Sequence, residues 1–265
     1  MAALDVGKKS ASRTIQKACV WAGPVMGVLF VVGFVVAGFF PPPSPNQSAA
    51  EVAAMIGQHR IAIRIGVVIC LASCRFLMPF LASFTIQMLR IEGPRPILAY
   101  TQLALGVLAT IEFVIPYVFM LVSTYRADQH PDVTRALYDI SWFFFLGVVS
   151  TFVLQLAVFG IAVLIDRRTK PIFPRWLGYV NLWLAITFIP ASFLVFFKTG
   201  PLAWNGILVW WVPVLSFLLW FLPNFVFLLR AIDADEDGDD DLPVARLERE
   251  VSGLRARLDA LSPTG

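Results

Sequence analysis

The chain has 265 residues, of which 58% are hydrophobic and 15% are charged, and its mean hydropathy is +0.75. A soluble domain is about half apolar and about a quarter charged, so this balance excludes an ordinary soluble protein and indicates a membrane protein. The formal net charge of +3 is too small to suggest a nucleic-acid partner.

Six long apolar runs divide the chain. A bilayer core of about 30 Å needs about 20 apolar residues in a helix, and helices satisfy the backbone of such runs within lipid. The runs cover residues 19–40, 61–88, 97–125, 140–165, 172–197 and 205–229. We therefore predict an all-α fold, a polytopic membrane bundle of six transmembrane helices within residues 19–230, followed by a short cytoplasmic C-terminal helix.

A basic N-terminal tail, residues 1–18, precedes the first run. That run is longer than the apolar part of a secretory signal and lacks a clean cleavage site, so we expect it to remain as the first span. The loop after it, residues 41–59, opens with Pro-Pro-Pro-Ser-Pro, which stops the helix. Within this loop, residues 48–58 are expected to form a short surface helix.

One basic and one acidic residue lie deep inside the second and third runs. Arg75 and Glu112 are each near the middle of a run, and a short turn joins the two runs, so we expect antiparallel neighbours with both charges at similar depth. Opposite charges at one level offset part of the cost of placing each in lipid. Pro79 and Pro116 each follow four residues later, so a kink is expected beside each charge. The pair is either a structural ion pair that fixes helix register, or a gate or a proton or solute site.

The last three runs carry amide side chains in the halves that lie toward the predicted cytoplasmic side. These residues are Gln155, Asn181 and Asn224. They either line a polar cavity open to the cytoplasm or form hydrogen bonds between helices, as polar side chains often do inside membranes.

Lysine and arginine are distributed unevenly between the two sides of the predicted bundle. About eleven lie on the side of the N-terminal tail and five on the other side. Because cytoplasmic segments are enriched in these residues, the asymmetry predicts that both termini are cytoplasmic and that the bundle lies in the inner (plasma) membrane of the cell. The cytoplasmic stretch 167–176 is basic and aromatic, which suits a surface of anionic lipids.

Two short segments flank the fifth run. FPRWLGY occupies residues 173–179, and TGPLAWNG occupies residues 199–206. Together with the proline-rich first loop, they resemble a group of uncharacterised multi-pass bacterial membrane proteins with six spans. The resemblance covers the spans and not the C-terminal tail, and it implies the topology only, without an activity or a functional residue.

The C-terminal region divides into an acidic linker, residues 231–241, and a tail, residues 242–265. The first aspartates of the linker match the start of a calcium loop, but Val244 stands where such a loop needs a bidentate glutamate, so we interpret the linker as a solvated run of charge. Between residues 244 and 261, valine and leucine recur at spacings of three and four, the pattern of a parallel two-stranded coiled coil. We expect a homodimer through this tail; the alternative is an amphipathic helix that lies on the bilayer or on its own bundle.

The sequence lacks the residue sets of the common membrane enzymes. Its two histidines, His59 and His130, fit no established metal-ligand spacing, and its three cysteines avoid the predicted exterior loops. Neither H-E-x-x-H nor G-x-S-x-G occurs, so no catalytic residue, metal or cofactor is expected. We predict a non-catalytic membrane subunit or scaffold that associates with itself through its C-terminal helix. The alternative is a small-solute or proton-coupled transporter or channel that uses Arg75 and Glu112.

Overall fold

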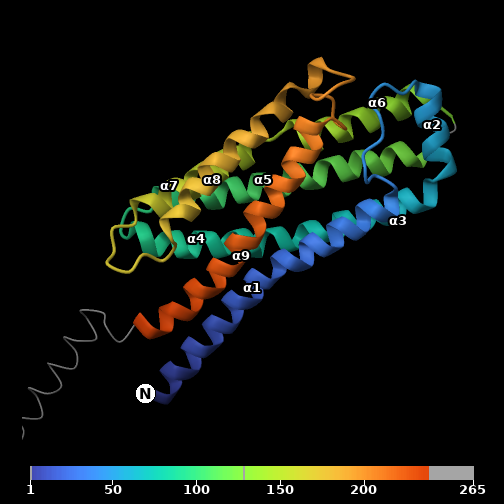
Figure 1. Ribbon diagram of the computed structural model, residues 1–265. Coiled ribbons are helices and arrows are strands. Elements are labelled where there is room, and N and C mark those ends of the chain that lie inside the picture. The colour runs from blue at the N-terminus through green and yellow to red at the C-terminus, as the bar shows by residue number, and fades with distance from the viewer. Residues whose placement is uncertain (1, 128, 239–265) are drawn as a thin grey trace, which may run out of the picture.

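Helices make up the regular structure of this protein. The computed structural model describes residues 2–127 and 129–238, and within them every regular element is helical (Figure 1). The α-helices are α1 (Ala2–Ala37), α2 (Ala49–Gln58), α3 (Arg60–Ser73), α4 (Leu77–Glu92), α5 (Ile97–Tyr125), α6 (Pro131–Trp142), α7 (Ser150–Ile165), α8 (Arg175–Phe188) and α9 (Val212–Gly238). The 3₁₀ segments are η1 (Cys74–Phe76) and η3 (Ile189–Phe196), and the π segments are η2 (Phe143–Gly147) and η4 (Ile207–Trp211). The predicted all-α fold is confirmed, while the tail 242–265 lies outside the described residues.

Six stretches of the described chain are long and apolar enough to cross a membrane. They cover Ala11–Ala37, Arg60–Glu92, Ile97–Tyr125, Pro131–Ile165, Arg175–Phe196 and Ile207–Ala234. Each overlaps one predicted run, so the prediction of a multi-pass protein with six spans is confirmed. The first and third spans are α-helical throughout, whereas each of the other four contains one of the 3₁₀ or π segments.

The spans pack against one another in chain order. α1 contacts α3 and α4, which in turn contact α5; α5 contacts α6 and α7, α7 contacts α8, and α8 contacts α9. α9 also contacts α1, so the bundle closes on itself (Figure 1). We call the end of the bundle where α1 begins and α9 ends the terminal end, and the opposite end, which carries α2 and α6, the loop end.

The helices of the first and last spans extend beyond the predicted runs at the terminal end. α1 begins at Ala2, within the predicted N-terminal tail, and α9 continues to Gly238, within the predicted acidic linker. Arg13 and Lys17 of α1 contact the carboxylate of Asp233 in α9, at 2.5 and 2.7 Å. These ion pairs join the two helix ends, so the first and last spans have their outer ends on the same side of the bundle.

The short surface helix that was expected in the first loop is present as α2. The side chain of Ser48 accepts a hydrogen bond from the backbone N–H of Glu51 at 3.3 Å, and the carboxylate of Glu51 accepts one from the N–H of Ser48 at 2.7 Å. This reciprocal pair is a capping box, which satisfies free N–H groups at the start of a helix. The hydrogen bonds from Ser48 lower the pKa of Glu51 below its ordinary value.

Glycines allow the fourth and fifth spans to approach closely. Gly160 of α7 faces Gly178 of α8, and a Cβ atom on either residue would lie 2.9 Å from the carbonyl oxygen of the other. Gly33 and Gly66 face each other in the same way between α1 and α3. Small residues at crossings are typical of helix packing in membranes, where apolar side chains gain little by leaving lipid.

Candidate functional site

Arg75 lies on the outward face of the second span. It belongs to η1, which interrupts the α-helix shortly before Pro79, where the sequence predicts a kink. Its side chain is exposed, and it shares one stripe of the span with three exposed apolar side chains. These residues are Ile65, Val68 and Ile86. Because exposed apolar side chains of a membrane span face lipid, the guanidinium of Arg75 lies on a lipid-facing surface.

Arg75 and Glu112 both lie near the middle of the membrane. Arg75 is about midway along the second span, Arg60–Glu92, and Glu112 is about midway along α5. At about 1.5 Å per residue, each charge is more than about 15 Å from either end of its span. The two spans are neighbours, because α5 packs on α3, η1 and α4.

The two charges do not form an ion pair within the part of the chain that the structure describes. Glu112 is half-buried and accepts a hydrogen bond from the hydroxyl of Thr151 in α7. Arg75 is exposed on the neighbouring span. Similar depth alone therefore does not bring the two charges into contact. The predicted ion pair within the chain is not confirmed.

Glu112 faces a break in the fourth span. α6 ends at Trp142, the π segment η2 follows, and α7 begins at Ser150, so the α-helix restarts near the middle of the membrane. N–H groups in the first turn of a helix have no partner within the helix and carry partial positive charge. Thr151 belongs to this first turn and donates its hydroxyl to Glu112. The carboxylate, the hydroxyl and the helix start form a polar site at mid-membrane that can hold a proton.

The three predicted amide residues are buried, but their hydrogen bonds stay within single helices. Asn181 donates to the carbonyl of Leu177 at 2.8 Å, and Asn224 donates to the carbonyl of Trp220 at 2.6 Å. Gln155 is 2% exposed, and neither of its side-chain polar atoms has a hydrogen-bond partner among the described residues. The hydrogen bonds between helices that were expected for these three residues are therefore not seen in residues 2–127 and 129–238. The alternative, a polar cavity, stays a prediction.

Two further buried amides were not predicted from the sequence. Gln87 accepts a hydrogen bond from Arg90, whose guanidinium also donates to the carbonyl of Ala231 at 3.2 Å. Gln102 is 1% exposed, and its side-chain oxygen has no hydrogen-bond partner in the described part of the chain. An amide inside an apolar run was the available signal for both. The contact from Arg90 links the second span to the sixth at the terminal end.

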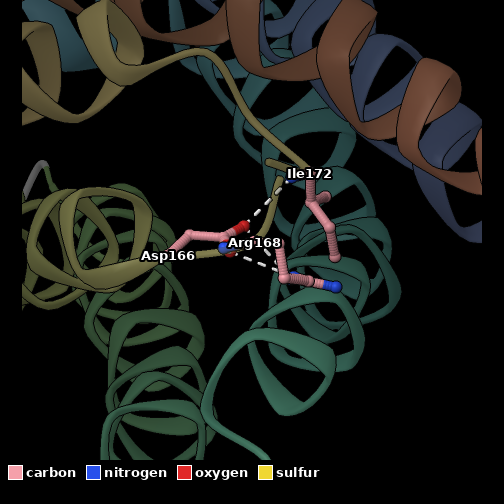
Figure 2. A network of polar contacts seen from close by, with 3 residues as sticks. All are labelled: Asp166, Arg168 and Ile172. Atoms are coloured by element: carbon pink, nitrogen blue, oxygen red, sulfur yellow. Dashed lines mark hydrogen bonds and ion pairs between the residues drawn. The ribbon is translucent and has the colours of Figure 1, made fainter. Parts of the chain in front are cut away.

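A buried carboxylate organises the loop between α7 and α8. Asp166 accepts hydrogen bonds from the backbone N–H of Arg168 and of Ile172, at 3.1 and 3.0 Å, and from the Arg168 guanidinium (Figure 2). Burial alone raises the pKa of Asp166, but the hydrogen bonds from Arg168 and Ile172 and the Arg168 charge outweigh it, so the pKa lies below its ordinary value. Asp166 was not predicted from the sequence, because a single acidic residue before a basic stretch carries no distinct pattern.

The same loop presents a basic and aromatic surface at the terminal end. Arg167, Lys170 and Arg175 are exposed, and Trp176 is 48% exposed beside them. Asp166 pairs with Arg168 and so offsets only one of the nearby positive charges. The predicted stretch 167–176 therefore keeps a net positive surface next to an exposed indole.

The cysteines and residues of metal-ligating types also lie in the described chain. Cys19, Cys70 and Cys74 are free thiols. Within residues 2–127 and 129–238, no group of three or more His, Cys, Asp or Glu side chains is placed to hold a metal ion. A small pocket at the loop end is lined mainly by aromatic side chains. Its lining residues are Phe34, Phe39, Pro116, Tyr117, Met120, Ser141, Trp142 and Phe145.

Comparison with protein-family models, with curated proteins and with solved structures finds no match to this chain. The resemblance of residues 173–179 and 199–206 to multi-pass bacterial membrane proteins therefore stays a prediction.

Proposed function

We propose that this chain is a non-catalytic subunit of a membrane complex and that it binds another membrane-spanning chain through the outward face of its second span. The observation that carries the proposal is the exposure of Arg75 among apolar side chains at mid-membrane. A charge at that depth costs roughly 2.5–3.5 kcal/mol on insertion scales. A partner that offers a hydrogen-bond acceptor at the same depth offsets this cost.

The interior of the bundle supports a structural role. Asn181 and Asn224 use their donors within their own helices, and aromatic rings from three spans pack around Phe84 at the terminal end. Phe84 lies 4.9 Å from the ring centre of Phe159 and 5.8 Å from that of Trp220. Such packing suits a rigid scaffold whose contacts with other proteins lie on its outer surface.

The distribution of basic residues supports a proposed placement of the chain in the cell. The basic residues at the terminal end favour a cytoplasmic position for both termini, in the inner (plasma) membrane. The exposed residues Arg167, Lys170 and Arg175 would then contact anionic lipids of the cytoplasmic leaflet, with Trp176 at the interface. The tail 242–265 adds a second route to association, through the heptad pattern of residues 244–261.

Site-specific photo-crosslinking in native membranes tests the proposed contact. A photoreactive residue at Val68, which is 52% exposed on the Arg75 stripe, is expected to capture another membrane protein or another copy of the chain. The matched control is Val31 of α1, which is 58% exposed on a different span. Equal capture at the two positions, or none at Val68, would contradict a binding surface on the second span.

The transport alternative rests on a different observation. Glu112 lies at mid-membrane beside the restart of the fourth span, and broken helices at this depth hold substrates or ions in many transporters. Under this alternative, Glu112→Gln leaves the amount of protein in the membrane unchanged but abolishes a proton or solute flux in vesicles. If vesicles that contain the purified chain show the same fluxes as vesicles without protein, this alternative is removed.

A further inference from the structure

Arg75 and Glu112 each reach the lipid-facing surface of the bundle. Arg75 is exposed, and Glu112 is half-buried next to Leu108 and Ile111, which are 49% and 48% exposed. The hydrogen bond from Thr151 uses one carboxylate oxygen of Glu112, Oε2. A carboxylate has acceptor capacity on both oxygens, so Glu112 can also bind a guanidinium. The surface of one chain thus presents a donor and a matching acceptor at the same depth.

We propose that a second copy of this chain is the partner, with Arg75 of each copy paired with Glu112 of the other. This inference rests on the proposed function and names its partner. It moves the ion pair that the sequence suggests within one chain to the contact between two chains. Both charges then obtain a partner without a change in the packing of either bundle.

Symmetry makes the second copy a better match than an unrelated helix. Two copies inserted in the same orientation are related by a twofold axis along the membrane normal, and such an axis keeps every residue at its depth. A twofold contact is self-complementary, so a contact from Arg75 to Glu112 occurs twice. A chain with opposite charges at one depth on neighbouring spans meets this condition, and the dimer carries two ion pairs.

Small side chains on the second and third spans allow close helix contact. Several of the exposed or half-exposed residues of these spans are alanines. The small residues are Ala72, Ala82 and Ala104. Apolar faces gain little by leaving lipid. Small residues therefore allow the helices to approach closely, and polar pairs determine which faces bind each other. The two ion pairs would therefore fix the relative position of the copies.

Photo-crosslinking between differently tagged copies of the full chain tests the dimer. Photoreactive residues at Val68 and at Leu108 are expected to join the two tags in native membranes, at twice the chain mass of 29.4 kDa. Val31 of α1 is the control position. This arm keeps Arg75 and Glu112 unchanged, so it does not depend on the folding of charge variants.

A complementation arm tests the charges themselves. Arg75→Leu in both copies, or Glu112→Leu in both, removes both ion pairs and should lower the crosslinked fraction about tenfold or more. When one copy carries Arg75→Leu and the other carries Glu112→Leu, one pair can still form, between Arg75 of the second and Glu112 of the first. Crosslinking between these two different copies should therefore exceed that within either variant alone. The amount of each variant in the membrane is measured in parallel.

Each outcome decides between the proposals. Preferential crosslinking of the complementary variants supports the dimer. Crosslinking that is equal in all combinations overturns the proposed ion pairs. Capture of a different protein at Val68 without self-crosslinking overturns the proposal that the partner is a second copy but retains the proposed function. Absence of any crosslink at Val68 and Leu108 overturns both, and leaves Arg75 extended toward the lipid headgroups.

Discussion

The contact between Gly160 and Gly178 gives a prediction whose size follows from the structure. An added Cβ at Gly160 would lie 2.9 Å from the carbonyl oxygen of Gly178 and 3.0 Å from Cγ of Leu182, whereas ordinary contact begins at 3.4 Å. The leucine can rotate, but a backbone oxygen cannot. Gly160→Ala therefore forces α7 and α8 apart by about 0.5 Å. Overpacking of this kind costs about 1–3 kcal/mol.

The matched control is Gly27→Ala in α1, where an added Cβ has no described atom within 4 Å. Alanine is favoured over glycine inside a helix by up to about 1 kcal/mol, so this variant should be neutral or slightly more stable. Gly178→Ala should resemble Gly160→Ala. The double variant should lower the free energy of unfolding by less than the sum of the two single variants, because one separation of the helices relieves both contacts.

Unfolding in mixed micelles, with the denaturing detergent as titrant and tryptophan fluorescence as signal, measures the free energies. The wild type and the four variants are compared under one condition. If Gly160→Ala is as stable as both the wild type and Gly27→Ala, the crossing of α7 and α8 is looser than the structure shows and the reasoning fails.

A reporter that is active only outside the cytoplasm should be silent when fused after Gly265 and active when inserted near Ser44, since the distribution of basic residues predicts that both termini lie inside; the opposite pattern would reverse the predicted topology. The folded-state pKa of Asp166 lies below its ordinary value, so its contribution to stability is present above the unfolded pKa of about 3.9 and is lost as the pH falls through the lowered folded value. Unfolding is measured from about pH 6 to about pH 3, a range that brackets this change. The free energy of unfolding should fall more steeply for the wild type than for Asp166→Asn, and parallel curves would exclude the loop carboxylate as the cause. In membranes, Leu254→Cys should crosslink two copies much more than Ser252→Cys, because position 254 belongs to the heptad seam, and equal yields would leave the surface-helix alternative for the tail.

The sequence by itself determined the number of spans and the depth of the charges. Hydropathy along the chain measures how much apolar length is available, and this length must match the bilayer, so six spans could be counted without a structure. The local sequence also specifies the start of α2, because Ser48 and Glu51 stand at the spacing of a capping box. The positions of Arg75 and Glu112 within their runs fixed their similar depth.

Only the tertiary structure decided which way each polar side chain faces. Lipid and protein interior are both apolar, so a membrane span lacks the polar face that reveals the orientation of a helix in water. For this reason the sequence could not show that Arg75 faces outward while Glu112 meets Thr151. The restart of the fourth span at Ser150 was not predicted either, because no proline marks it. Packing between neighbouring spans sets these directions, and it depends on contacts between residues far apart in the chain.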